Sequence, residues 1–536
     1  MKPLRMLSTA LLTSVLLLGS ATAAWAAVPI EQAVIGGNNQ ILGSVSTVAG
    51  KGDNGEANGD ATSATFRSPW SLLPMTDGSW LVADSKSHLI RKLSGNQMSA
   101  YAGITFKRDN YDNPIGGLVD GKVAASVFQQ PKGLAADAQG TVYVADSENH
   151  AIRKIDTTGN VTTLAGSGVL GSKDGKGKEA SFHSPQDVAV AADGTLYVAD
   201  TLNHAIRKIT ADGTVSTLNA LSTRAVEIVP GQVVPAGDYA DGALKSAKFN
   251  EPGGLVLDAQ GNLYVSDTGN QLIRYIDFKT GQVSTVAGLI PAGNAALYEK
   301  NELYAAGDLI DGKASEAAFK YPKGLALTAE GGLLIADSLN HSIRYLKDGV
   351  VSTLAGEREG LSGFADGPDR KAGLQNPTDV AVGADGSVWI ADAYNNKIRK
   401  LSFYSLPDGI TDDGVIKVVN GDKRVTFESQ PENVNGRVLV PVRAITEALG
   451  FEVKFNENAT TGERTVLLSK GSTSVELTIG KQQIKRIVPN TAAVIKEIDV
   501  APYIQADLTY VPIRFFSEEL GLDVQWDAAT ETVILR

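Results

Sequence analysis

The sequence predicts a mainly β protein with a small mixed domain at its C-terminal end, and three observations support this. A pattern with the core V-A-D, or the close variants V-S-D and I-A-D, recurs six times between residues 81 and 401 at a fixed internal spacing. Each copy divides into short apolar segments separated by Gly and Asp turns, as strands do. Beyond residue 405 a different repeat, present twice, combines strand and helix periodicities. Four short antiparallel strands per copy, repeated six times, describe a six-bladed β-propeller.

The N-terminus reads as an export signal. Lys2 and Arg5 precede the apolar run LLTSVLLL, and ATAAWAA then offers an A-x-A cleavage site at residues 24–26. We therefore expect residues 1–26 to be a signal peptide and the mature chain to be secreted or held at the cell surface. No later run approaches the ~18 apolar residues of a membrane span, so no transmembrane segment is predicted. The chain has no cysteine, which excludes disulfides and a lipid-modified cysteine.

Composition and motifs exclude several classes of function. The formal net charge of −11 describes an acidic protein, for which nucleic acid is not an expected partner. The sequence contains no P-loop, G-x-S-x-G, H-E-x-x-H or zinc-spaced cysteine pattern. We predict that the protein binds no cofactor and no metal, and we assign no residue a catalytic role.

The six copies share one rigid frame. In each, an Asp lies fifteen residues after a Pro and seven before an Arg, and a turn pair such as Asp-Gly lies eleven before that Pro. All length variation falls between the Arg of one copy and the turn pair of the next. Within the second copy, GLAAD (133–137), TVYVAD (141–146), HAIRKI (150–155) and NVTTLAG (160–166) are the four predicted strands.

The two ends of the array predict a closed ring. A fourth-strand motif follows five of the six frames, and none follows the sixth. A spare copy, VSTVAG (45–50), precedes the first frame. We expect this N-terminal strand to complete the last blade and close a propeller over residues 44–402, because closure removes exposed edges. A solenoid is the alternative, although solenoids rarely have four strands per repeat.

The shared pattern P-x-G-L-x-x-D-x-x-G-x-x-Y-V-A-D-x-x-N-H-x-I-R-K resembles the NHL repeat. The resemblance covers roughly residues 44–402 and implies the propeller fold. It implies little about activity, because NHL propellers include binding modules, receptor sensors and a few lyases.

A linker is expected over residues 403–415, where SLPDGITDDG combines Pro, Gly and Asp. Beyond it, RVLVPVRAITEALGFEVKF (437–455) pairs with LTYVPIRFFSEELGLDVQW (508–526), each predicting a strand, a helix ending at Gly and another strand. Residues 416–536 resemble the copper amine oxidase N-terminal domain, a stalk domain of exported Gram-positive proteins. That resemblance implies attachment or spacing. Oxidase activity is not expected, because the last histidine of the chain is His341.

The repeated polar residues are predicted to hold turns. An Asp that ends a strand commonly accepts backbone N–H groups and pairs with a nearby Arg; a ring of cation-binding carboxylates is the alternative. A histidine follows four residues later in four copies, and Gln271 or Asn396 replaces it in the other two. Neither amide can shuttle protons as imidazole does, which favours turn packing. The six structural positions are Asp84, Asp146, Asp200, Asp267, Asp337 and Asp392.

Candidate ligand contacts lie where the six copies differ. Residues after each Pro begin the innermost strand and are expected to line the channel mouth, where a polar pocket can form. The long loops between blades emerge on the same face and are typical recognition surfaces. The channel-mouth candidates are Trp70, Lys132, His183, Asp187, Lys323 and Asp379, and the recognition-loop candidates are Tyr111, Tyr239, Tyr298 and Tyr304.

These features favour an exported binding or scaffold protein. Its propeller would recognise an envelope polysaccharide, a peptide or a surface protein, while the C-terminal domain serves attachment or spacing. The alternative is a propeller lyase or hydrolase that uses carboxylates and His183 at the channel mouth. A third possibility is a purely structural component of the envelope.

Overall fold

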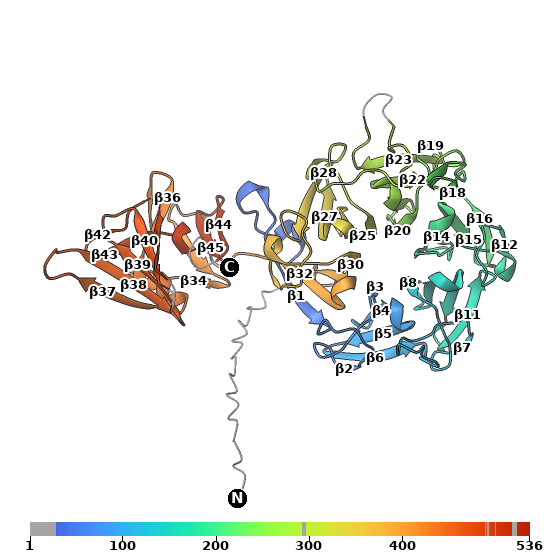
Figure 1. The fold of residues 1–536 in the computed structure, drawn as a ribbon, viewed down its shortest axis with the longest axis horizontal. Helices are drawn as coiled ribbons and strands as arrows, with labels where there is room; N and C mark the ends of the chain where they lie inside the picture. Colours follow the sequence, from blue (N-terminus) through green and yellow to red (C-terminus); the bar gives the residue numbers. More distant parts are fainter. Residues whose placement is uncertain (1–27, 292–295, 488, 490–491, 499, 517–521) are drawn as a thin grey trace, which may run out of the picture.

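Six five-stranded sheets surround a central axis in the computed structural model (Figure 1). The structure describes residues 28–536 except 292–295, 488, 490–491, 499 and 517–521. The predicted signal peptide lies outside these residues. The ring of sheets confirms the six-bladed propeller, and we number the blades by the order of the six frames.

Each blade has four antiparallel frame strands and a two-residue outer strand at its turn pair. From the axis outward, the strands are as follows. Blade 1 has β3 (Pro69–Pro74), β4 (Trp80–Asp84), β5 (Leu89–Ser94), β6 (Gln97–Ala102) and β2 (Gly59–Asp60); blade 2 has β8 (Pro131–Ala136), β9 (Val142–Asp146), β10 (Ala151–Ile155), β11 (Asn160–Ala165) and β7 (Gly121–Lys122). Blade 3 has β13 (Asp187–Val190), β14 (Leu196–Asp200), β15 (Ala205–Ile209), β16 (Thr214–Thr217) and β12 (Gly175–Lys176); blade 4 has β20 (Pro252–Leu257), β21 (Leu263–Asp267), β22 (Leu272–Asp277), β23 (Gln282–Ala287) and β19 (Gly242–Ala243). Blade 5 has β25 (Pro322–Leu327), β26 (Leu333–Asp337), β27 (Ser342–Lys347), β28 (Val350–Ala355) and β24 (Gly312–Lys313).

Blade 6 contains the strand that closes the ring. It has β30 (Pro377–Val382), β31 (Val388–Asp392), β32 (Lys397–Phe403), β1 (Gly43–Ala49) and β29 (Gly367–Pro368). Strand β1 pairs antiparallel with β32, from Gly43 opposite Phe403 to Ala49 opposite Ile398. The prediction that an N-terminal strand completes the last blade is confirmed.

The apolar core is divided among the junctions between blades. Because side chains alternate along a strand, each blade presents an apolar surface on both faces. Between blades 1 and 2, Leu81 and Ile90 pack in one cluster with Phe128 and Val144. The frame residue three before each Pro, here Phe128, is fully buried, which explains why this position is aromatic or Leu in every copy.

The C-terminal domain consists of three sheets and one described α-helix, α1 (Val442–Ala448). Gly450 has φ of +74°, a conformation that favours glycine and ends the helix. Residues 517–521, where most of the second predicted helix falls, lie outside the described part of the chain. The sheets are β34-β33-β45-β44 (Lys423–Arg424, Lys417–Asn420, Thr532–Leu535, Val524–Asp527), β35-β36-β43-β42 (Glu432–Val434, Arg437–Pro441, Leu508–Pro512, Tyr503–Gln505) and β37-β38-β39-β40-β41 (Glu452–Glu457, Arg464–Lys470, Thr473–Thr478, Gln483–Ile487, Val494–Glu497).

Blade 6 and the C-terminal domain meet at a small apolar contact. Leu42 and Tyr404 pack against Val419 and Ile534, and the Tyr404 hydroxyl donates to the carbonyl of Gly421 at 2.7 Å. Tyr404 is fully buried, so the segment expected to be a linker begins as packed structure. Among the described residues, no helix is both long and apolar enough to cross a membrane.

Candidate ligand site at the channel mouth

The repeated Asp and Arg form a buried ion pair in every blade, with N···O distances of 2.6 to 2.9 Å. In blade 2, Asp146 Oδ2 accepts a hydrogen bond from Arg153 Nη1 at 2.7 Å, and Oδ1 accepts the backbone N–H of Gln129 at 2.7 Å. Arg153 Nη2 reaches Asp120 of the turn pair at 2.9 Å. The guanidinium lies over the ring of Phe128, 4.9 Å from its centroid. The ion pair therefore ties the inner turn of a blade to its outer edge.

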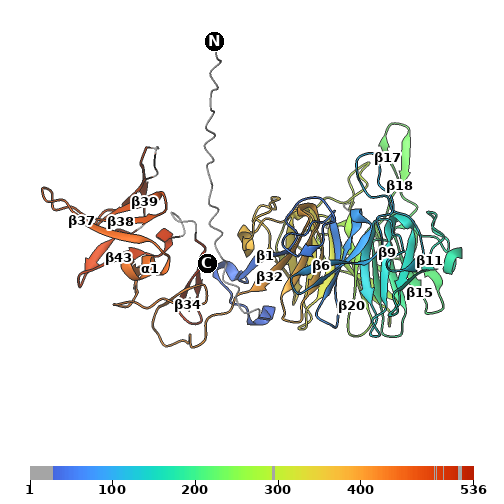
Figure 2. The same cartoon turned by 90° about the horizontal axis from the view of Figure 1, so that it is seen from below.

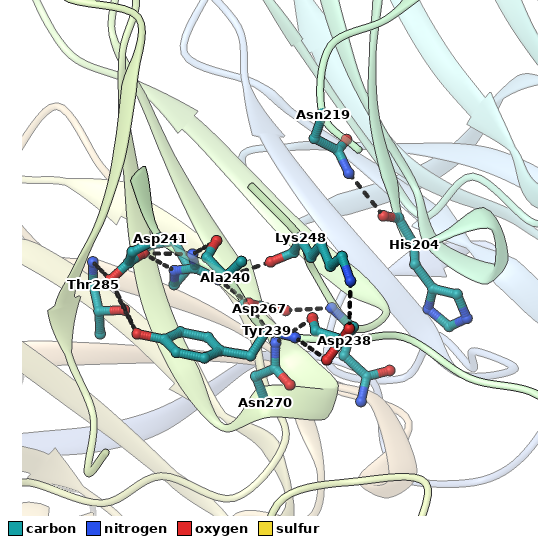
Figure 3. Close-up of polar contacts among 12 residues, drawn as sticks. His204, Asn219, Asp238, Tyr239, Ala240, Asp241, Lys248, Asp267, Asn270 and Thr285 are labelled. Atoms are coloured by element: carbon teal, nitrogen blue, oxygen red, sulfur yellow. Dashed lines mark hydrogen bonds and ion pairs between the residues drawn. The ribbon is translucent and has the colours of Figure 1, made fainter. Parts of the chain in front are cut away.

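Figure 3 shows the same frame in blade 4. Asn270 donates to Asp267 at 2.8 Å and to the carbonyl of Asp238 at 3.1 Å. Asp241 of the turn pair accepts from the N–H and the hydroxyl of Thr285, both at 3.0 Å. The carboxylates of the frame are thus engaged by protein donors within their own blade.

The histidine position of the frame joins each blade to the next. His88 Nδ1 accepts the backbone N–H of Gln130 at 2.9 Å, so Nε2 carries the proton and faces the carbonyl of Pro114 at 3.1 Å. Burial lowers the pKa of His88, which keeps the imidazole neutral as this arrangement requires. Equivalent bonds run from Ser184 to His150, from Glu251 to His204 and from Asn376 to His341.

The two exceptions to histidine preserve this contact. Gln271 Oε1 accepts the N–H of Tyr321 at 2.6 Å, and its Nε2 donates to the carbonyl of Ala305 at 3.1 Å. Asn396 accepts the N–H of Ser68 at 2.9 Å and so joins blade 6 to blade 1. What the position requires is a neutral acceptor, which imidazole and both amides supply.

Three of the predicted mouth residues meet at the axis. Lys132 Nζ lies 4.7 Å and Lys323 Nζ 4.4 Å from the centroid of the Trp70 ring. The three side chains come from β8, β25 and β3, so blades 2 and 5, on opposite sides of the ring, both reach the Trp of blade 1. Lys132 is only 8% exposed. Within the described residues, neither ammonium group has a hydrogen-bond or ion-pair acceptor.

The two lysines are held at an energetic cost. Burial lowers the pKa of Lys132 to about 8. Burial, followed by repulsion from Lys132, lowers the pKa of Lys323 to about 8. Both remain mainly charged at pH 7. A cation over an aromatic face gains about 0.5–2 kcal/mol, less than the several kcal/mol that desolvating an unpaired ion costs, so Trp70 compensates only part of the penalty.

Asp187 and Asp379 each connect two blades at the mouth. Asp187 accepts the N–H of Leu255 in the next blade at 2.7 Å, and Asp379 accepts that of Leu72 at 2.9 Å. Burial raises the pKa of Asp379 to about 7. Burial and then the charge of Asp379 raise the pKa of Asp187 well above its usual range. At neutral pH the two acids therefore offset only part of the positive charge of the lysines.

The mouth repeats after three blades, a feature that the sequence prediction missed. Pro-Lys-Gly in blades 2 and 5 is followed in the next blade by Pro-x-Asp. A Cβ on Gly133 would lie 2.3 Å from Asp187 Oδ1, and one on Gly324 would lie 2.2 Å from Asp379 Oδ1. Each glycine therefore makes room for the neighbouring carboxylate. Trp70 breaks the twofold pattern, because blade 4 has Gly253 at that position.

His183 lies in a separate pocket of about 370 Å³ on the same face. Its ring is in edge-to-face contact with that of His150, with 5.8 Å between the ring centroids. Glu251 and Tyr304 also line the pocket. In the described part of the chain no contact joins His183 to Asp187, so the histidine and carboxylates of the predicted alternative are not brought together. Nor do the described residues contain a group of three or more His, Cys, Asp or Glu side chains placed to hold a metal ion.

Three of the four predicted recognition tyrosines make contacts within the protein. Tyr239 donates to Asp241 at 3.0 Å, and Tyr304 donates to Glu251 at 3.0 Å. Tyr298 stacks on Arg224, whose guanidinium carbon is 3.6 Å from the ring centroid.

The long loops also expose apolar side chains. Tyr111 is 86% exposed. The hairpin of β17 (Ala225–Val229) and β18 (Gln232–Pro235) stands out from the propeller (Figure 2), with Val233 61% exposed.

Comparison with known families agrees with this architecture. Residues 128–155, 182–209, 249–274 and 374–401 match the NHL repeat, and residues 418–535 match the copper amine oxidase N-terminal domain. The fold is that of a β-propeller protein. The chain contains NHL repeats and, after them, a copper amine oxidase N-terminal domain.

Two curated relatives match this chain over part of their own length. The chain is 31% identical over 296 residues to Protein SUPPRESSOR OF QUENCHING 1, chloroplastic, of Arabidopsis thaliana, covering 53% of this chain and 26% of that protein. It is 29% identical over 406 residues to NHL repeat-containing protein 2 of Bos taurus, covering 70% of this chain and 53% of the relative. The chain thus spans about half or less of the length of these relatives.

Solved structures of similar fold include a protein of unknown function from Bacteroides thetaiotaomicron. It is 21% identical with a TM-score of 0.47, covering 68% of this chain and 76% of the other. A streptogramin B lyase structure is 13% identical with a TM-score of 0.39, covering 67% of this chain and 98% of the other.

Proposed function

We propose that the chain is an exported binding protein whose propeller recognises an envelope or extracellular ligand at the channel mouth. The supporting observation is the pair of lysines, Lys132 buried and Lys323 partly buried, which meet at the Trp70 ring with no acceptor among the described residues. In the frame around them, the carboxylate of each repeated Asp is paired with the Arg of its own blade, and neighbouring blades are linked by hydrogen bonds. The mouth is therefore where the fold leaves charge available to a ligand.

The remaining parts of the proposal follow from the sequence. Residues 1–26 act as a signal peptide, residues 44–402 form the propeller, 403–415 connect, and 416–536 serve attachment or spacing at the cell surface. Expression in a Gram-positive host tests export: the secreted chain should begin near Ala27, and retention of an uncleaved chain in the cytoplasm would contradict it.

Cosedimentation with purified cell-wall sacculi tests binding. The full mature chain should pellet with sacculi, and Trp70→Ala should reduce the bound fraction because it removes the ring shared by both lysines. Lys279→Met is the control, since Lys279 lies in an exposed turn and is not among the candidate ligand contacts. Absence of binding by the wild-type chain to sacculi, with or without their attached proteins, would reject an envelope ligand.

A further inference from the structure

We propose that Lys132 and Lys323 clamp the anionic group of the ligand, a carboxylate or a phosphate, beside Trp70 at the channel mouth. This inference rests on the proposed function, because it names the chemistry by which the mouth would recognise its ligand. The charge of the site selects an anionic ligand, because two ammonium groups beside one ring repel a cation and attract an anion.

The first step is the convergence of the two charges. Both Nζ atoms lie within 4.7 Å of the centroid of one ring, although their strands belong to opposite blades. Lys132 is more than nine-tenths buried and lacks an acceptor among the described residues. A bound oxyanion would supply the acceptor that each ammonium lacks, and hydrogen bonds between charged groups are the strong ones.

The second step concerns the acidic groups near the lysines. The negative charge of Glu148 raises the pKa of Lys132, and that of Glu251 raises the pKa of Lys323. Neither glutamate forms an ion pair with its lysine. Glu251 is already engaged by the Tyr304 hydroxyl at 3.0 Å, and Ser184 donates to Glu148 at 3.3 Å. Asp187 and Asp379 accept backbone N–H groups instead. None of these carboxylates occupies the place of the anion.

The third step predicts how binding depends on pH. The lysines lose their protons as pH rises through about 8, and Asp379 gains negative charge as pH rises through about 7. Both changes weaken attraction for an anion. Affinity should therefore be highest below pH 7 and fall about tenfold or more by pH 9.5.

Calorimetric titration of the full mature chain tests the proposal with three probes. D-glucuronate offers a carboxylate, glucose 1-phosphate a phosphate and glucose neither. We expect one or both anions to bind at pH 6.5, glucose not to bind, and the stronger anion to identify the source. Lys132→Met combined with Lys323→Met should abolish binding while keeping the stems packed on Trp70. Lys279→Met, in an exposed turn, is the matched control and should bind as wild type does.

Binding of neither anion, equal binding of glucose, or unchanged affinity in the double variant would overturn the proposal. If the double variant does not fold, the pH dependence of the wild-type chain decides, and constant affinity from pH 6.5 to 9.5 would contradict the clamp. Cosedimentation separates the two proposals. A double variant that still binds sacculi rejects the clamp and leaves the binding function standing, whereas anion binding without sacculus binding rejects the envelope ligand alone.

Discussion

Two clusters of charged side chains in the propeller differ in their surroundings. At Asp146 and Arg153, the carboxylate and both Nη atoms have partners in the turn, the strand and the outer edge of the blade. At Lys132 and Lys323, the ammonium groups meet one aromatic ring and no acceptor in the described chain. Paired charge determines the geometry of the blade. Unpaired charge at the mouth leaves an interaction that a ligand can complete.

Breaking a frame pair should have the largest effect. Arg153→Ala leaves the buried Asp146 without its cationic partner, which is expected to lower the free energy of unfolding by about 3–5 kcal/mol. Lys400→Ala is the control, because it removes a surface pair with Asp385 and should cost below about 1 kcal/mol. Urea denaturation measures both. An Arg153→Ala loss no larger than that of Lys400→Ala would show that the frame pair does not hold the blade.

The hydrogen bond that joins neighbouring blades should depend on the presence of an acceptor at the histidine position. It should tolerate replacement of the imidazole ring by an amide. His88→Ala leaves the N–H of Gln130 without its acceptor, and we expect a loss of about 1–3 kcal/mol. His88→Gln should cost little, because Gln271 makes the same two bonds in blade 4. Equal losses for Ala and Gln would contradict this role.

The pH dependence of stability should report the neutral state of these histidines. Burial lowers the pKa of His204 to about 4, against about 6.5 in an unfolded chain. The unfolded state therefore binds more protons between these values, and this histidine reduces stability as pH falls from about 6.5 to about 4. Relative to wild type, His204→Gln should gain stability on the order of 3 kcal/mol across that interval. Parallel urea midpoints for the two proteins from pH 7 to pH 4 would contradict it.

Removing charge at the mouth should act in the opposite direction from removing it in the frame. Lys132→Met replaces an unpaired buried cation with an apolar side chain of similar length. The ligand-free chain is expected to gain about 1 kcal/mol, as apolar replacements of buried ions often do. Thermal unfolding without added anions measures the gain, and a destabilisation comparable to that of Arg153→Ala would show that the lysine belongs to the frame.

The sequence was sufficient for features that repeat. Six registered copies and one spare strand predicted the blades and their closure, because each depends on local strand patterns and counting. The exchange of His for Gln271 and Asn396 favoured a packing role, but the bonded partner lies in the next blade and could not be read from spacing.

Features that depend on long-range contacts were not predictable. The positions of Trp70, Lys132 and Lys323 at the starts of inner strands were expected, yet their convergence joins residues up to 253 apart in the chain. The stacking of Arg224 on the ring of Tyr298 likewise joins two loops that are far apart in the sequence. The repeated Pro-Lys-Gly was a visible signal of the three-blade pattern, and its meaning needed the contact between Gly133 and Asp187.

The most direct test is to titrate the two mouth lysines by NMR, using protein labelled at lysine Cε and assigned through Lys132→Met and Lys323→Met. Without ligand, both should titrate near pH 8. With saturating anion, their pKa values should rise towards 10 or above, because the bound anion stabilises the charged form. Ordinary lysine titration in the free protein, or no change on adding anion, would contradict the claim that the mouth holds unpaired charge for a ligand.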